Sequence, residues 1–509
     1  MSLDTGNVAR IPHSEIGNTE AHITDAGALT LSSWIKRREV SCEEVMRAYL
    51  NRIDQCNPSL NAIVSRVDSD ILLSRATERD KQLAAGDYLG PLHGFPQAPK
   101  DLASVGDMPT SMGSPLFAGK IPAADSVVME RIRRNGALFV GRTNTPEFGL
   151  GGQTYNPVFG ATRNPWDLTK TPAGSSGGAA VALAARMLPV ADGSDMMGSL
   201  RTPAAYNNVF GFRNSRGVIP YGPGPELYLN QFSYDGAMAR NVPDLALLLS
   251  VMAGHDARVP LSTPVDASAF ADFAYNADAS MGDYKGVRIG WLSDMGGQLP
   301  IEPEVLTLCE TALETFKTIG CSVEHVDVAK FGVDMPTLFA SWTTLRSFIM
   351  AGNFNALYRD PVTRSQFKPE MIWEIEKGLA LSGSDIYDAS VQRSSWHRCL
   401  SGLFAHYDYV VLPSAQLFPY DVETHWPKRI AGRDMDTYHR WMEVVVPASL
   451  AGAPAISVPA GFSTAGLPMG IQIIGPVSGD LDVLKIAHAY DIARGRAETD
   501  RPVTSDGMA

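Results

Sequence analysis

The sequence feature that most limits how this chain folds is the segment at 171–205, TPAGSSGGAAVALAARMLPVADGSDMMGSLRTPAA. Two Gly/Ser-rich turns flank an alanine-rich helical run and a short apolar strand. Small residues let a backbone approach a ligand closely. Backbone amides in such turns direct N–H donors toward developing negative charge. Ser199 directly follows the second turn, where a nucleophile would have main-chain donors beside it.

Other readings of this segment compete with a nucleophile at Ser199. GSSGG matches G-x-S-x-G, with Ser176 as the nucleophile of an α/β-hydrolase elbow, but that elbow needs an apolar strand before it and DLTKTPA stands there. No G-K-[ST] follows the glycine-rich turn, so the segment does not predict a phosphate loop. For GSSGG taken alone, a structural loop beside a core helix is the favoured interpretation.

Helical and strand patterns alternate along the chain and predict an α/β fold. Ser41 and Glu44 form a capping box before a helical run. A helix is predicted at 125–136 and a strand at 137–143, and a long helical stretch covers roughly 334–405. Further strands are predicted at 287–294, 409–414, 455–462 and 466–475. Residues 144–236 are dense in Gly, Pro, Asn, Ser and Thr and predict ordered loops.

Composition excludes several classes of function. The net charge of −12 argues against nonspecific binding to nucleic acid or to an anionic membrane. The five cysteines show no CxxC spacing and the ten histidines no HExxH, so neither a disulfide framework nor a metal site is expected. No apolar run is long enough to span a membrane, and we expect a cytoplasmic protein. Polar ends are predicted as an arm at 1–26 and a tail at 496–509.

Four blocks in this order are similar to those of the amidase signature family: PLHGFPQAPKD (91–101), RNPWDLTKTPAGSSGG (163–178), GSDMMGSLRTPAA (193–205) and VFGFRNSRGVIP (209–220). LAGAPAISVPAGF and GLPMGIQIIG near the C-terminus resemble the family as well. The likeness spans about 27–495. It implies one large α/β domain with a central mixed β-sheet covered by helices on both faces.

The resemblance implies a Ser–cisSer–Lys triad. The family's lysine falls on Lys100, its bridging serine after a cis peptide bond on Ser175, and its nucleophile on Ser199. The backbone amides of the oxyanion hole fall on the turn at Met196, Met197, Gly198 and Ser199. Supporting positions fall on Gly174, Ser176, Asp195 and Arg201.

The chemistry of these residues agrees with that assignment. A serine hydroxyl needs a base to act as a nucleophile. An exposed lysine is almost wholly protonated at pH 7, so Lys100 requires burial to lower its pKa. The family's reaction is hydrolysis of linear amide C–N bonds through an acyl-enzyme, with esterase, lactamase or carbamate side activity. It implies no metal and no organic cofactor.

The sequence departs from the family at the oxyanion turn, where Met197 and Gly198 stand in place of the usual Gly-Gly. Met196 and Met197 either form an adaptable apolar wall of the pocket or point into the core. The family's substrate pocket corresponds to 146–154 and to the aromatic-rich region 330–450. The residues we expect to bind substrate are Phe148, Leu150, Met197, Trp342 and Trp441. They favour bulky, aromatic or hydrophobic amides.

Three functions remain open at this stage. The first is an amidase acting alone, expected as a homodimer, on a small-molecule amide. The second is the glutaminase A-type subunit of a tRNA amidotransferase, whose oxyanion turn normally reads Thr-Gly-Gly where this chain has Met196-Met197-Gly198. The third is a non-catalytic amidase-like protein, against which the intact Lys100, Ser175 and Ser199 speak.

Overall fold

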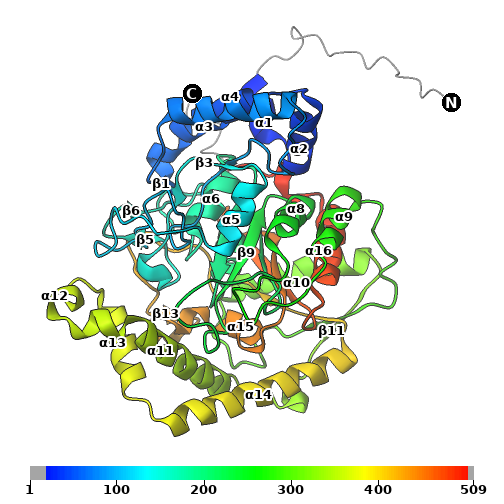
Figure 1. The fold of residues 1–509 in the computed structure, drawn as a ribbon. Helices are drawn as coiled ribbons and strands as arrows, with labels where there is room; N and C mark the ends of the chain where they lie inside the picture. Colours follow the sequence, from blue (N-terminus) through cyan, green and yellow to red (C-terminus); the bar gives the residue numbers. More distant parts are fainter. Residues whose placement is uncertain (1–18, 503–509) are drawn as a thin grey trace.

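An eight-stranded sheet runs through the centre of the computed structural model, which describes residues 19–502 (Figure 1). The strand order is β11–β10–β12–β16–β15–β8–β9–β7. β10 pairs parallel with β11 and β12, while the other neighbours pair antiparallel, so the sheet is mixed as expected. The strands are β7 (Ala191–Asp195), β8 (Phe210–Arg213), β9 (Tyr234–Ala239), β10 (Arg288–Trp291), β11 (Ser322–His325), β12 (Tyr409–Pro413), β15 (Ala455–Phe462) and β16 (Pro468–Ile474).

Short two-residue strands form four additional ladders within the described residues. The pairs are β1 (Ile63–Val64) with β4 (Arg142–Thr143), β2 (Pro96–Gln97) with β3 (Leu138–Phe139), β5 (Tyr155–Asn156) with β6 (Gly160–Ala161), and β13 (Arg429–Ile430) with β14 (Arg433–Asp434). The strand predicted at 137–143 is therefore divided between two ladders. Gly141 lies between the two ladders, and a Cβ there would lie 2.9 Å from the carbonyl oxygen of Val64, so the chain has room only for a glycine at this point.

Helices pack on the sheet in two groups, which together cover both of its faces. The helices that precede β10 in the chain are α1 (Thr19–Asp25), α2 (Ala28–Arg37), α3 (Cys42–Leu60), α4 (Ser69–Ala84), α5 (Val127–Arg134), α6 (Gly177–Ala184), α7 (Arg201–Asn207), α8 (Val242–Met252) and α9 (Ser268–Asn276). Those after it are α10 (Pro303–Thr318), α11 (Met335–Arg359), α12 (Pro361–Arg364), α13 (Pro369–Leu379), α14 (Gly383–His406), α15 (Val446–Ala451) and α16 (Asp480–Arg494). Short 3₁₀ turns are η1 (Glu147–Gly149), η2 (Val328–Phe331), η3 (Arg440–Val445) and η4 (Ala497–Thr499). One group contains α6 and α7, and the other contains α8, α10 and α16.

The capping box predicted at the start of α3 is confirmed. Ser41 Oγ accepts a hydrogen bond from the Glu44 amide, and a Glu44 carboxylate oxygen accepts one from the Ser41 amide. These reciprocal bonds satisfy two amides that no helical carbonyl can reach. Val45, Tyr49 and Ile53 follow at helical spacing and are all buried, so one face of α3 packs on the core.

The loop-rich region at 144–236 is largely buried, unlike most loops. Asparagine side chains make this possible because they satisfy backbone carbonyls inside the protein. Asn164 Nδ2 donates to the carbonyls of Thr171 and Tyr206 at 3.1 and 2.9 Å. Asn207 Nδ2 donates to those of Pro172 and Pro203 in the same way. The segment is thus an internal scaffold that holds the short elements β7, α6 and α7.

The predicted helical stretch forms α11, α12, α13 and α14, in which α11 packs on the other three, and they are drawn in olive to yellow along the lower edge of Figure 1. These helices lie beyond the sheet and cover one side of the molecule near η3 and α15. Their inner faces supply one wall of the pocket described below.

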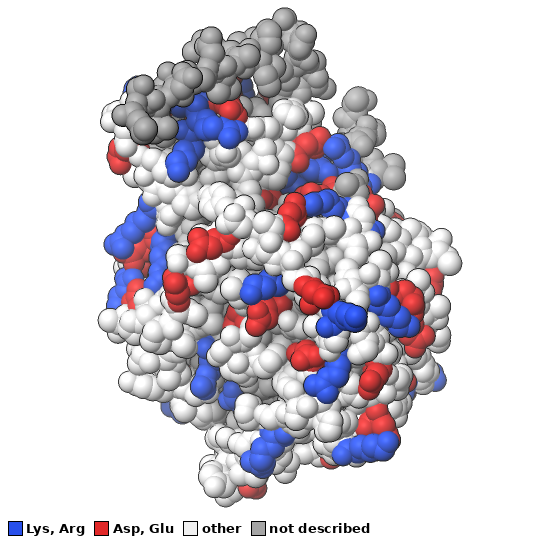
Figure 2. Space-filling view, turned by 90° about the vertical axis from the view of Figure 1, so that its right-hand side faces the viewer, with Lys and Arg blue, Asp and Glu red and all other residues white. Residues whose placement is uncertain are grey.

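The predicted terminal segments extend beyond the described residues, since 1–18 and 503–509 lie outside them. Within the predicted arm, α1 forms a helix that packs on α3. Acidic and basic side chains are interspersed on the face shown in Figure 2, with neither sign gathered into a broad patch. That face has no continuous basic surface of the kind that binds a nucleic-acid backbone.

Candidate active site

Ser199 lies in the turn between β7 and α7, and Asp195 organises that turn. The Asp195 carboxylate accepts hydrogen bonds from the amides of Gly198 and Leu200 at 2.9 and 3.2 Å. Gly198 has a φ of +73°, and a Cβ there would lie 2.7 Å from Val445. A glycine is therefore needed at this position for both backbone and space.

Four backbone amides in this turn were predicted to form an oxyanion hole. The Gly198 amide already donates a hydrogen bond to the Asp195 carboxylate, so it is not free to bind a substrate oxygen. The amides of Met196, Met197 and Ser199 have no hydrogen-bond acceptor within residues 19–502. Three unpaired donors therefore lie beside the Ser199 hydroxyl.

Ser175 lies beside this turn, after a cis peptide bond between Gly174 and Ser175. A Cβ on Gly174 would lie 3.1 Å from the backbone of Gln153, so the smallest residue suits this crossing. The amide of Ser176 donates to the carbonyl of Ser199 at 3.1 Å, which ties the two serine-bearing segments together.

Lys100 lies behind the serines, and its ammonium or amine group meets three hydroxyls. Nζ is 2.7 Å from Ser175 Oγ, 2.8 Å from Ser176 Oγ and 3.0 Å from Ser194 Oγ. The Lys100 amide donates to Asp192 at 3.0 Å, which fixes the backbone that carries the side chain. The structure therefore brings together the three residues expected to form the triad.

The surroundings of Lys100 disfavour its charged form. The side chain is only 1% exposed. Burial lowers the pKa of Lys100 to about 7, although the carboxylates of Asp192, Asp195 and Asp235 act in the opposite direction. Desolvation thus outweighs the nearby negative charge. A lysine with this pKa is substantially unprotonated at neutral pH.

A buried ionic network supports the turn from below. Arg201 Nε and Arg213 Nη1 lie 3.1 and 3.3 Å from the Asp195 carboxylate. Burial acts to raise the pKa of Asp195, but the two guanidinium groups hold it far below its usual value. Arg201 also donates to Gln472 and Ser449, both at 2.7 Å, and so connects the turn to β16 and α15. Asp195 and Arg201, two of the predicted supporting residues, belong to this network, and the third, Ser176, contacts Lys100 Nζ through its Oγ.

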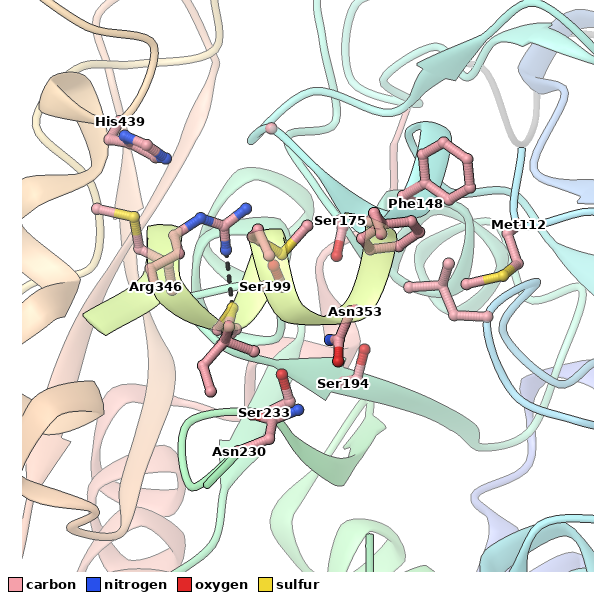
Figure 3. Close-up of a pocket in the computed structure, with 18 of the residues that line it drawn as sticks. Met112, Phe148, Ser175, Ser194, Ser199, Asn230, Ser233, Arg346, Asn353 and His439 are labelled. Atoms are coloured by element: carbon pink, nitrogen blue, oxygen red, sulfur yellow. Dashed lines mark hydrogen bonds between the residues drawn. The ribbon is translucent and has the colours of Figure 1, made fainter. Parts of the chain in front are cut away.

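A pocket opens above Ser199 and has two chemically different ends. Figure 3 shows Phe148 and Met112 on one side of Ser175 and Ser199, with Arg346 and His439 on the other. The aromatic end is a packed cluster in which the ring of Phe148 lies 4.9 Å from that of Phe354 and 6.0 Å from that of Phe117.

Only part of the predicted substrate-binding set lines this pocket. Phe148 and Met197 do, as does Met196. Leu150, Trp342 and Trp441 do not line it and are buried in the protein core. Leu150 and Trp441 border a separate small hollow beside Lys368, and Trp342 packs edge-on against His439.

The methionines of the oxyanion turn resolve a question that the sequence left open. Met196 and Met197 both line the pocket, and both also pack against the main hydrophobic core. Met197 is 4% exposed, so it forms a wall between core and pocket. Both alternatives considered for these side chains are therefore correct, because each side chain lines the pocket and also contacts the core.

Sequence reasoning missed the polar end of the pocket. Arg346 lines it from α11, and Nε of Arg346 lies 2.8 Å from Glu374 on α13. His439 Nε2 lies 3.1 Å from the same Glu374 carboxylate oxygen. Burial acts to raise the pKa of Glu374, but Arg346 and His439 lower it to about 2. Burial lowers the pKa of His439, although the Glu374 carboxylate acts in the opposite direction.

A signal for this end was present in the spacing along α11. Arg346, Met350 and Asn353 are four and three residues apart, so they share one helix face, and all three line the pocket.

In the part of the chain that the structure describes, no group of three or more His, Cys, Asp or Glu side chains is arranged to hold a metal ion. None of the helices there is long and apolar enough to cross a membrane.

Comparison with known proteins identifies the family. The Amidase family model matches residues 44–484. An acylamidase of Rhodococcus erythropolis is 33% identical over 482 residues, covering 94% of this chain and 98% of the relative. The A-type subunit of the glutamyl-tRNA(Gln) amidotransferase of Thermosynechococcus vestitus is 34% identical over 476 residues, covering 89% and 95%.

A solved structure shares the fold as well. The chain superposes on a bacterial aryl acylamidase of the amidase signature family with a TM-score of 0.85 and 28% identity, covering 94% of this chain and 99% of that one. This chain therefore belongs to the amidase signature family, whose members are hydrolases acting on amide C–N bonds. The expected family, fold class and enzyme class are confirmed.

Proposed function

We propose that this enzyme hydrolyses small-molecule amides that carry a bulky, aromatic or hydrophobic group. Ser199 acts as the nucleophile, Ser175 as the proton relay and Lys100 as the base. The observation that carries the proposal is the 2.7 Å contact between Lys100 Nζ and Ser175 Oγ in a buried site that opens beside Ser199. A base and a hydroxyl at this distance are within reach of proton transfer.

The surroundings of Lys100 suit a neutral amine. A neutral amine has two N–H donors and one lone pair. Three hydroxyls surround Nζ, so it accepts from Ser175 while donating to Ser176 and Ser194. Lys100 thereby draws a proton from Ser175, which in turn takes one from Ser199 as Ser199 attacks.

The reaction then follows from the geometry of the turn. The Ser199 oxygen forms a bond to the carbonyl carbon, and the carbonyl electrons move to oxygen, where the free amides of the turn stabilise the charge. Ser175 returns the proton to the nitrogen as the C–N bond breaks and the amine leaves. Water then attacks the acyl-enzyme, gives up a proton by the same relay, and releases the acid and Ser199.

The aromatic end of the pocket supports a hydrophobic substrate group. Phe148, Phe354 and Met112 line it, and they offer apolar surface rather than charge. The similarity to a solved aryl acylamidase supports this preference. The glutaminase subunit remains the alternative, and we further propose that the enzyme is a cytoplasmic homodimer rather than one component of a hetero-complex.

The experiment that tests the function is turnover of an amide panel by the wild type and by Ser199→Ala. The panel contains L-glutamine, acetamide, benzamide, acetanilide, a fatty amide and an aryl carbamate. Release of aromatic amine or hydrophobic acid, lost in Ser199→Ala, is the expected result. Hydrolysis of glutamine alone would move the assignment to the amidotransferase component, and absence of any turnover would contradict an active enzyme. Light scattering on the purified chain tests the homodimer.

A further inference from the structure

The two ends of the pocket are placed differently with respect to the proposed proton relay. A Cβ on Gly149, next to Phe148, would lie 3.6 Å from Ser175 Oγ. The aromatic end is therefore beside Ser175, the residue that protonates the leaving amine in the proposed function. Arg346 and His439 lie on the opposite side of Ser199 (Figure 3). The polar end consequently faces the acyl part of the substrate.

Arg346 is held rigidly at this end but retains unused donors. Its Nε binds Glu374 at 2.8 Å, and its Nη2 donates to Tyr438 Oη at 3.3 Å. Nη1 lies 2.7 Å from the Sδ of Met196 and has no oxygen acceptor within residues 19–502. A thioether is a weak acceptor. The side chain of Arg346 is 7% exposed and lines the pocket, so a buried guanidinium there has five N–H groups but only two oxygen acceptors.

The charge of the cluster restricts what binds there. Arg346 is the one Lys, Arg, Asp or Glu side chain among the described residues that line the pocket, and the Glu374 carboxylate paired with it carries the opposite charge. A substrate carboxylate would add a second anion to an already balanced pair in a buried place, which is unfavourable. A neutral oxygen acceptor uses the free N–H without burying a net charge.

We propose that Arg346 binds a neutral carbonyl oxygen in the acyl part of the substrate, so that the preferred substrates are amides with an apolar amine and a second carbonyl in the acid. This inference rests on the proposed function, because Ser175 defines which end receives the amine. Arg346 is thus a specificity-determining residue, and Glu374 sets its preference for a neutral acceptor over an anion.

The test uses five 4-nitroanilides, which all release the same amine. The hexanoyl, 5-oxohexanoyl and glutaryl compounds compare an apolar, a neutral carbonyl and a carboxylate end. The 4-oxopentanoyl and 6-oxoheptanoyl compounds vary the distance of the second carbonyl from the amide. Release of 4-nitroaniline gives kcat/KM for each. For the wild type, the best oxo-acyl substrate is expected to exceed hexanoyl by about tenfold to a hundredfold, the range for a hydrogen bond to a charged group. The glutaryl substrate is expected to fall below the oxo-acyl ones.

Variants separate recognition from a structural role. The Arg346→Met/Glu374→Gln double variant, which leaves no unpaired buried charge, is expected to lose the preference for oxo-acyl over hexanoyl. Glu374→Gln alone leaves the guanidinium uncompensated and is expected to shift preference toward glutaryl by about tenfold. Arg393→Met removes a partly buried arginine on α14 that does not line the pocket and is the matched control, with preferences unchanged.

The outcomes distinguish this inference from the proposed function. Equal kcat/KM for hexanoyl and all oxo-acyl substrates, with every activity lost in Ser199→Ala, would overturn the role of Arg346 and leave the amidase standing. A wild-type preference for glutaryl would overturn the neutral acceptor. No hydrolysis of any anilide would overturn both proposals. If the variants fail to fold, the wild-type comparison among the matched substrates still decides the question.

Discussion

The floor and the wall of the active site are built in different ways. The floor consists of Lys100, the serines and the turn at 195–201, where buried polar contacts hold the Lys100 side chain and the Asp195 carboxylate while three amides of the turn keep free N–H groups. The wall consists of side chains from α11 and from residues 438–442, where apolar packing surrounds one ion-paired cluster at Arg346. Substitutions on the floor break polar contacts around Lys100 and the turn, whereas most positions of the wall contribute apolar surface. We therefore expect substitutions on the floor to reduce activity or stability, and substitutions on the wall to change selectivity.

The largest effect is expected at Ser199, the proposed nucleophile. Ser199→Ala removes the attacking oxygen, and kcat/KM for any hydrolysed amide is expected to fall by about 10⁴ or more. Steady-state kinetics with the best substrate of the panel measures it. Ser401→Ala changes an exposed serine on α14 and serves as the control, with kcat/KM unchanged. Activity retained in Ser199→Ala would place the chemistry elsewhere.

Lys100, the proposed base, is expected to give a characteristic pH dependence of kcat/KM. Because burial lowers the pKa of Lys100 to about 7, the amine is protonated below that pH and neutral above it. The kcat/KM of the wild type is expected to rise about tenfold per pH unit below pH 7 and to level off above it. Lys100→Met is expected to lose about 10³ in kcat/KM together with this rise.

Exposed Lys317, which pairs with Glu314 on the surface of α10, provides the control for the lysine. Lys317→Met is expected to keep both the rate and the pH profile. A wild-type profile that stays flat from pH 6 to 9, with the chemical step limiting, would argue that a group other than Lys100 is the base.

The next largest effect is expected on the free energy of unfolding, when the ion pairs of Asp195 are broken. Asp195→Asn leaves Arg201 and Arg213 buried without their carboxylate, at an expected cost of about 3–5 kcal/mol. Thermal unfolding followed by circular dichroism measures the loss. Asp436→Asn, at an exposed pair with Arg440, is expected to cost under about 1 kcal/mol. Equal melting temperatures for these two variants would contradict a floor held by buried charge.

The aromatic part of the wall is expected to change selectivity rather than chemistry. Phe354→Ala removes a ring that packs on Phe148 and is expected to lower kcat/KM for anilides about tenfold while affecting acetamide much less. The ratio of the two substrates is the measurement. Phe404→Ala on α14, away from this pocket, is the control and is expected to keep the ratio. A uniform loss for both substrates would mean that Phe354 supports the floor.

The smallest effect is expected at the outer end of the helical wall. Ser382 caps α14, with its Oγ accepting from the Asp385 amide at 3.2 Å. Ser382→Ala is expected to cost about 1 kcal/mol, with kcat/KM unchanged. Ser382→Asp keeps a capping oxygen and is expected to restore the melting temperature. A loss of activity in Ser382→Ala at a temperature where it is folded would show that the wall and the floor are coupled.

Much of the candidate site was predictable because its residues lie in short segments with characteristic sequences. Ser175 and Ser199 lie in glycine-rich turns whose composition already indicates close backbone approach, and Lys100 lies in a block that accompanies them. The fold class followed from alternating helix and strand patterns, and the capping box at Ser41 marked the start of α3 correctly. These features depend on neighbours within a few residues, so a sequence pattern reports them.

The pocket wall was less predictable. Trp342 and Trp441 were expected to touch substrate because they are aromatic, yet the core encloses both. Arg346 was overlooked because a single arginine in a helix is usually at the surface. Hydrophobicity indicates that a side chain is buried, but it does not indicate whether that side chain is enclosed by the core or lines a pocket.

The sequence by itself determined the family and the α/β class, and it supplied the residues proposed as nucleophile, relay and base together with the local turns that carry the two serines. Only the tertiary structure decided that Lys100 is shielded from water and meets Ser175, 75 residues away in the chain, and that Arg346 lines the pocket while Trp342, one turn earlier on the same face of α11, is enclosed by the core. The physical reason is that desolvation, and whether a buried side chain meets a pocket or the core, depend on segments distant in the chain. Those segments come together only when the whole protein packs.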